Sequence, residues 1–141
     1  MRKILNTRSP RAHYDAGAFI LWCFDDRFSK VLSEFQSQFL HDDTVKLAGG
    51  MYMLASGTKD QKRLVLDQIK KSIQLHHTKR IGIMGHIDCA MYGGSKKFAG
   101  HRAEVKHHTK ELKAARKTVK KRFPKLKVDL YLADFDGLYQ L

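Results

Sequence analysis

Residues 18–27 read AFILWCFDDR and residues 80–89 read RIGIMGHIDC. Each stretch begins with a mostly apolar run, Ala18–Trp22 in the first and Arg80–Met84 in the second, and each continues into polar residues and a cysteine. Short apolar runs bounded by turn residues are typical of buried β-strands. The two stretches therefore predict two strands that lead directly into residues able to carry out chemistry.

Two further strands are predicted at Thr44–Leu47 and Val128–Leu132. Helical periodicity fills the intervals, because apolar residues recur at steps of three, four or seven within Phe28–Phe39, Lys59–Leu75 and the basic segment Lys96–Lys127. Strands that alternate with helices predict an α/β fold in which helices cover a mainly parallel sheet.

The chain has 141 residues and a formal net charge of +13. This length predicts a single domain over residues 1–141, in which residues 1–16 form an N-terminal arm or a short helix docked on a partner.

No apolar run approaches the roughly 20 residues that a membrane helix needs. The opening residues also lack the apolar centre of a secretory signal, so we expect a cytoplasmic protein.

The positive charge is concentrated in the segment Lys96–Lys127, which holds 13 Lys and Arg residues and two acidic residues. Such a segment can bind the phosphates of nucleic acid or another anionic surface. A solvated helix face is the interpretation that we favour here. It is favoured because Val105, Leu112 and Val119 recur every seven residues and form one narrow apolar stripe that would pack on a core.

Three residues that can bind a metal follow the first and third strands: Cys23, His86 and Cys89. Ligand sites of open parallel sheets lie at the carboxyl ends of the strands, so these side chains converge if the two strands are neighbours. Two thiolates and an imidazole suit Zn²⁺, and three protein ligands leave a fourth position for water, as in catalytic sites. Buried cysteines that act as small apolar residues, and a disulfide, are the alternatives.

The motifs around these residues are C-x-D-x-R in Cys23–Arg27 and G-H-x-x-C in Gly85–Cys89. With them the sequence resembles the β-class carbonic anhydrases, which carry these motifs after their first and third strands. Val45–Gly49, which reads VKLAG, takes the place of the V-R-N-A-G segment of that family and departs from it at two positions. The resemblance covers roughly residues 17–94, and it implies a three-layer α/β fold whose mainly parallel sheet has the strand order 2-1-3-4.

The resemblance also implies an activity, the zinc-dependent reversible hydration of carbon dioxide to bicarbonate by zinc-bound hydroxide. It implies that Cys23, His86 and Cys89 hold the Zn²⁺. It implies that Asp25, paired with Arg27, accepts the hydrogen bond of the hydroxide and orients it, or becomes a fourth zinc ligand in a closed form. A homodimer or a dimer of dimers is implied as well, because the family builds its pocket at a subunit interface.

Other functions stay open at this point. The same fold and zinc site can serve the hydrolysis of carbonyl sulfide or carbon disulfide. A non-catalytic, zinc-stabilised protein that binds nucleic acid through Lys96–Lys127 is less favoured, because a structural zinc site would not need Asp25 and Arg27 and more often has a fourth Cys or His ligand. Redox sensing through Cys23 and Cys89 is a weaker alternative.

Overall fold

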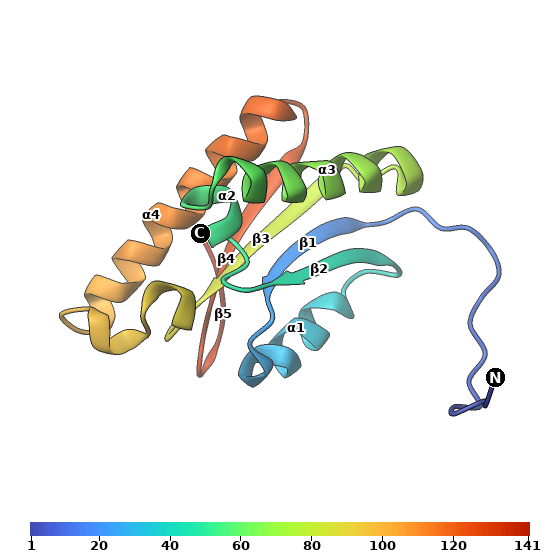
Figure 1. Ribbon diagram of the computed structural model, residues 1–141, viewed down its shortest axis with the longest axis horizontal. Helices are drawn as coiled ribbons and strands as arrows, with labels where there is room; N and C mark the ends of the chain where they lie inside the picture. Colours follow the sequence, from blue (N-terminus) through green and yellow to red (C-terminus); the bar gives the residue numbers. More distant parts are fainter.

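One five-stranded sheet forms the centre of the protein, in a computed structural model that describes all 141 residues (Figure 1). The strand order is β2-β1-β3-β4-β5. The first four strands are parallel, and β5 pairs antiparallel with β4. The predicted order 2-1-3-4 is therefore confirmed for the parallel strands. The strands are β1 (Ala18–Cys23), β2 (Asp42–Leu47), β3 (Arg80–His86), β4 (Lys127–Asp134) and β5 (Gly137–Gln140).

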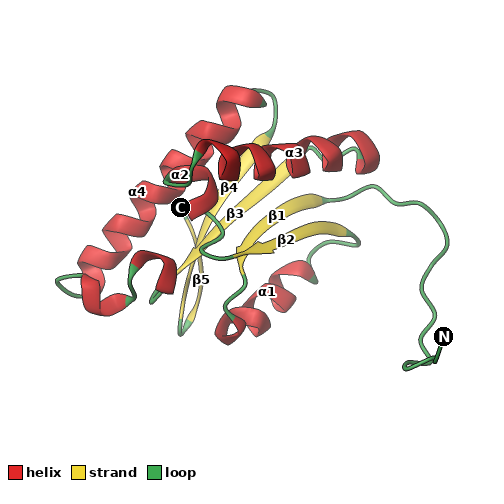
Figure 2. Cartoon of the chain, viewed as in Figure 1, coloured by secondary structure: helices red, strands yellow, loops and turns green.

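Helices cover both faces of this sheet, as the predicted three-layer architecture requires (Figure 2). One face carries α1, and the other carries α2, α3 and α4. No helix is both long enough and apolar enough to cross a membrane. The α-helices are α1 (Ser29–Gln36), α2 (Tyr52–Ala55), α3 (Lys59–His76) and α4 (His101–Arg122), and the short 3-10 turns are η1 (Asp26–Phe28), η2 (Ala90–Tyr92) and η3 (Ser95–Lys97).

All six residues of β1 are buried, because the sheet is covered on both sides. Side chains alternate between the two faces of a strand. The larger core, which α2, α3 and α4 complete, takes Phe19, Leu21 and Cys23. The smaller core, which α1 completes, takes Ala18, Ile20 and Trp22. The alternation therefore directs Cys23 towards the face that α2, α3 and α4 cover.

The helix boundaries follow local chemistry. The side chain of Thr58 accepts a hydrogen bond from the N–H of Gln61, and the side chain of Gln61 accepts one from the N–H of Thr58, so a capping box starts α3. The first helix is shorter than its predicted range Phe28–Phe39, because its end tightens into i to i+3 hydrogen bonds up to Phe39. The last helix ends at Arg122, two residues before Pro124.

Two elements were absent from the sequence prediction. The first is β5, whose hairpin with β4 turns at Phe135 and Asp136. Gly137 is already part of β5, so the two-residue turn Phe135-Asp136 is not the Asn-Gly or Asp-Gly loop that signals a hairpin in a sequence. The second is α2, a single turn that follows the two glycines Gly49 and Gly50. Before Ala18 the chain has no helix or strand. Tyr14 and Ala16 still form hydrogen bonds to Asp43 and His76, and the residues before them extend away from the sheet (Figure 1).

Candidate metal centre

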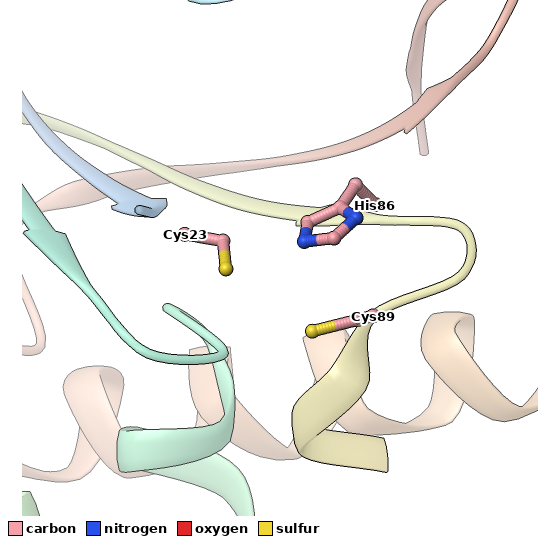
Figure 3. Close-up of side chains that lie close together, drawn as sticks. All are labelled: Cys23, His86 and Cys89. Atoms are coloured by element: carbon pink, nitrogen blue, oxygen red, sulfur yellow. The ribbon is translucent and has the colours of Figure 1, made fainter. Parts of the chain in front are cut away.

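Neighbouring strands bring Cys23, His86 and Cys89 together (Figure 3). Cys23 is the last residue of β1, His86 is the last residue of β3, and Cys89 directly precedes η2. The two sulfur atoms and one imidazole nitrogen all lie within 4.8 Å of one another. All three residues are buried, with 5%, 1% and 3% of their surface exposed. The convergence expected at the carboxyl ends of β1 and β3 is therefore present.

The glycine at position 50 lets the segment after β2 lie against the end of β1. Gly50 adopts a φ of +43°, and a Cβ at this position would lie 2.8 Å from the backbone nitrogen of Cys23. Only glycine allows so close an approach at this φ. The segment after β2 can therefore pass directly against the end of β1, where Cys23 lies.

The ring of His86 is oriented by the turn that follows it. Its Nδ1 lies 2.8 Å from the carbonyl oxygen of Ile87, and since a carbonyl only accepts, Nδ1 carries the proton and donates it. The ring also packs against Phe28, with ring centres 4.6 Å apart. The other nitrogen, Nε2, is buried and has no hydrogen-bond partner in the protein. In the neutral ring, which is the form of histidine that binds metals, the lone pair therefore lies on Nε2.

The two cysteines are free thiols that interact with each other. The neighbouring Cys89 thiol, the imidazole of His86 and the backbone N–H of Asp25 together hold the pKa of the Cys23 thiol well below its ordinary value. The same pairing and burial raise the pKa of Cys89. One thiol is therefore ready to become a thiolate, which is the form of cysteine that binds metals.

This donor set fits a zinc ion. In a tetrahedral zinc site with Zn–S bonds of about 2.3 Å and Zn–N bonds of about 2.0 Å, the ligand atoms are about 3.5–3.8 Å apart. The separations here, up to 4.8 Å, need only small side-chain movements to reach those values. The lone pair on Nε2 of His86 is the feature that decides the fit, because a buried nitrogen without a partner is costly unless another group binds it.

Asp25 lies beside the cluster but is not one of its members. Its carboxylate accepts hydrogen bonds from the backbone N–H of Arg27 at 3.1 Å and from Nη2 of Arg27 at 2.7 Å. These bonds lower the pKa of Asp25 to about 2, so the group is ionised at any physiological pH. The structure thus has Asp25 bound to Arg27 rather than placed among the three metal-binding side chains.

Asp88 holds the other side of Arg27. Its Oδ2 accepts a bond of 2.8 Å from Nη1 of Arg27, and its Oδ1 accepts one of 2.8 Å from the N–H of Ser95. These contacts lower the pKa of Asp88. The backbone of Asp88 is left-handed, with a φ of 58°, which few residues other than glycine adopt. The side chain of Arg27 and the backbone N–H of Ser95 therefore hold the turn between His86 and Cys89 in an unusual conformation.

A residue that sequence reasoning missed completes this arrangement. Glu104 of α4 is 1% exposed, and its Oε1 accepts a hydrogen bond of 2.7 Å from the N–H of Asp88. His108, one turn further along, is also buried, and burial lowers its pKa to about 4. Its Nε2 lies 3.5 Å from Oε1 of Glu104. The signal was available, since Glu104 and His108 continue the buried stripe of Leu112 and could have been recognised as polar residues on an apolar face.

The family model described as "Putative carbonic anhydrase" matches residues 15–138. The chain belongs to this family. It is also similar to an uncharacterized protein of Rickettsia bellii (strain RML369-C), with 27% identity over 150 residues that cover 99% of this chain and 92% of the relative. The resemblance to carbonic anhydrases that the two motifs indicated is thereby confirmed.

Solved structures of carbonic anhydrases share the fold. A β-carbonic anhydrase of Trichomonas vaginalis has a TM-score of 0.66 at 16% identity, covering 96% of this chain and 87% of that protein. One from Aspergillus fumigatus has a TM-score of 0.64 at 14% identity, covering 91% and 76%. At these identities the similarity establishes the fold of this chain and no more.

Two other neighbours bear on the alternatives. The apo form of a carbon disulfide hydrolase has a TM-score of 0.53 at 16% identity, covering 90% of this chain and 79% of that protein. A tetrameric β-carbonic anhydrase from Sordaria macrospora has a TM-score of 0.52 at 14% identity, covering 91% and 81%. The same fold thus occurs with a second substrate and in an oligomer.

Proposed function

We propose that this protein is a zinc-dependent enzyme that catalyses the reversible hydration of carbon dioxide to bicarbonate. The observation that carries the proposal is the unpartnered Nε2 of His86, buried between two cysteine sulfurs and next to a carboxylate that an arginine holds in place. Membership of the carbonic anhydrase family supports the same activity.

Cys23, His86 and Cys89 would hold the metal ion. A zinc ion bound there supplies the Lewis acidity that produces a hydroxide nucleophile from water near neutral pH. The Nδ1–H of His86 donates to the carbonyl of Ile87, which fixes the ring with Nε2 facing the two sulfurs. Partners of this kind raise the affinity of a site because they orient its ligands before the metal binds.

Asp25 and Arg27 would act on the nucleophile. An ionised carboxylate can only accept hydrogen bonds, so Asp25 can hold the hydrogen of the attacking oxygen and leave an oxygen lone pair directed at the substrate. Arg27 fixes Asp25, and Asp88 fixes Arg27 with a bond of 2.8 Å. This chain of contacts keeps the orientation of Asp25 constant at little entropic cost during the reaction.

We also propose that a second copy of the chain covers the site. Three large apolar side chains near it are exposed: Phe24 next to Cys23 (62% exposed), Met91 two residues after Cys89 (39%), and Phe135, which packs on Phe28 (65%). Exposed apolar groups that cluster around a site are typical of an interface. A homodimer or dimer of dimers would have a molar mass of two or four times 16.3 kDa, and a light-scattering mass of one chain would contradict it.

Hydrolysis of carbon disulfide is the second candidate function. It is favoured by the structural neighbour that is a carbon disulfide hydrolase and by the apolar side chains Phe24, Met91 and Phe135 near the site. Either reaction requires both cysteines as free thiols, and both are unpaired here. Free thiols persist in reducing compartments, so they support our proposal that the protein acts in the cytoplasm.

Stopped-flow hydration of carbon dioxide between about pH 6.5 and 9, on protein of confirmed zinc content, tests the proposal. We expect a rate enhancement that rises with pH. Asp25→Asn should retain zinc and lower kcat/KM by about 10- to 100-fold, because the acceptor that orients the nucleophile is weakened. The matched control is Asp26→Asn, since the carboxylate of Asp26 contacts only Ser29, at 2.6 Å, and should change the rate less than about twofold.

Two results would contradict this assignment. Zinc-loaded protein with no rate enhancement at any pH would exclude carbonic anhydrase activity. The same protein would then be assayed with carbon disulfide and carbonyl sulfide. Full activity in Asp25→Asn would remove Asp25 from the catalytic machinery.

A further inference from the structure

The outer face of α4 is the most strongly charged surface of the protein, and the zinc chemistry does not use it. The helix contains nine Lys and Arg residues, all of them exposed, and we call these nine side chains the basic face. Its two acidic residues point elsewhere. Glu104 is buried against Asp88, and Glu111 accepts hydrogen bonds from Ser56 at 2.6 Å and Tyr92 at 3.0 Å.

The cations of the basic face have no acidic partners. None of the nine forms a salt bridge anywhere in the chain. Lys120 alone is engaged by acceptors, the carbonyl oxygens of Pro124 and Leu126. Other exposed helix positions do carry pairs, such as Lys30 with Glu34 on α1. A row of like charges on one helix repels itself and attracts a polyanion.

A groove between α3 and α4 extends the basic face. The two helices cover the same side of the sheet (Figure 1). The groove has a volume of about 580 Å³, and its lining contains five cations and one carboxylate, that of Asp67. The cations are Lys59, Lys62 and Arg63 of α3 and Lys121 and Arg122 of α4. Two helices thus contribute positive charge to one continuous surface.

The side chains of the basic face indicate which kind of polyanion it can bind. No large apolar side chain of α4 is exposed, so the helix has nothing to insert into a lipid bilayer. It also has no Phe, Tyr or Trp on which unpaired bases could stack. What remains is a row of cations on 22 residues. At 1.5 Å per residue this row is about 33 Å long, which corresponds to about ten base pairs of duplex at 3.4 Å each.

We propose that the basic face binds the phosphate backbone of double-stranded nucleic acid, without sequence specificity. From the sequence alone a solvated helix face was the favoured interpretation of this segment. Because the cations lack acidic partners and a cationic groove is shared with α3, the structure favours a binding surface over a solvated face. The proposal does not depend on the enzymatic function, because the binding surface shares no residue with the metal centre.

Fluorescence anisotropy with a labelled 20-base-pair duplex of mixed sequence, titrated between about 50 and 300 mM salt, tests this proposal. We expect a dissociation constant of about 1–100 μM at physiological salt. The slope of log K against log salt should be about −4 to −5, as for about five phosphate contacts. The double variant Lys113→Gln/Lys117→Gln should weaken binding at least about tenfold at 100 mM salt and make the slope less steep by about two.

The matched control is Lys3→Gln/Lys30→Gln, which removes the same charge from the N-terminal segment and from α1, outside the basic face. It should leave the slope unchanged. The circular dichroism spectrum and the midpoint of urea unfolding serve as measures of folding and should be the same in both double variants. The proposal is overturned if the duplex does not bind at 50 mM salt, or if both double variants lose affinity equally. It is also overturned if vesicles with anionic headgroups bind the chain more tightly than the duplex does.

Discussion

Each end of the sheet carries a histidine in a polar cluster, and the two clusters differ in one respect. At the carboxyl ends of the strands, Nε2 of His86 is buried without a partner between Cys23 and Cys89. Near the amino end of β2, Nδ1 of His76 contacts Asp43 at 2.8 Å, and the hydroxyl of Tyr14 donates to the same carboxylate at 2.9 Å.

This difference separates a site for an external group from a structural cluster. Buried polar groups normally find partners within the protein, and the cluster around Asp43 obeys that rule. At His86 the rule is broken where three zinc-type donors converge. Burial and histidine content are therefore not what distinguishes the metal centre. The distinguishing feature is a lone pair without a protein donor that lies beside two thiols. Buried nitrogens without a partner also occur at Trp22, His107 and His108, but these residues do not belong to the cluster. Three substitutions test this comparison.

The largest effect is expected from Cys89→Ser. A serine hydroxyl stays protonated and cannot replace a thiolate ligand, so the affinity for zinc should fall by at least about 100-fold and hydration should fall to background. Zinc content after dialysis against a weak chelator, together with a competition titration, measures the change. His76→Gln alters the other cluster and should retain one zinc ion per chain. Equal zinc content in both variants would remove the distinction between the two clusters.

A smaller effect is expected from Glu104→Ala, because Glu104 acts on the metal centre through the turn that carries Cys89. The substitution leaves the N–H of Asp88 without its acceptor, and the affinity for zinc should fall by about tenfold. Glu104→Gln keeps an oxygen acceptor and should restore most of that affinity. If Glu104→Ala lowers the stability of the fold and leaves zinc affinity unchanged, Glu104 is a structural residue and not a positioning residue.

Much of this arrangement was predictable because it depends on local patterns. Apolar runs gave four strands in the correct places, and two short motifs indicated that Cys23, His86 and Cys89 would converge. Periodicity places Glu104 on the buried stripe of α4, but it does not reveal the role of this residue, which depends on the packing of α4 against a turn 16 residues earlier. The edge strand β5 was missed because its four residues are too few for a clear alternation and the turn before it, Phe135-Asp136, is not an Asn-Gly or Asp-Gly pair.

The smallest effect on the metal centre is expected from Asp43→Asn, which should leave zinc binding and hydration unchanged. Burial alone would raise the pKa of Asp43, but hydrogen bonds from Ser72, His76 and Tyr14 outweigh it, and the pKa of the carboxyl lies below its ordinary value. Because the folded protein prefers the ionised form, Asp43 stabilises the fold above the pKa of the unfolded chain, about 3.9. Near neutral pH the substitution should therefore lower the free energy of unfolding by about 1–2 kcal/mol.

The loss of stability in Asp43→Asn should depend on pH, and this dependence tests whether the ionised carboxylate stabilises the cluster around Asp43. As the pH falls through the lowered pKa of Asp43, the wild-type carboxylate is protonated and its advantage over asparagine disappears. Urea unfolding at about pH 5, 4 and 3 should show the two curves converging below about pH 4. A stability difference that stays constant to pH 3 would mean that the ionised form of Asp43 is not what stabilises this end of the sheet. Loss of zinc from Asp43→Asn near neutral pH would mean that the two clusters are coupled, and an unsatisfied nitrogen alone would no longer explain why only one of them is suited to a metal.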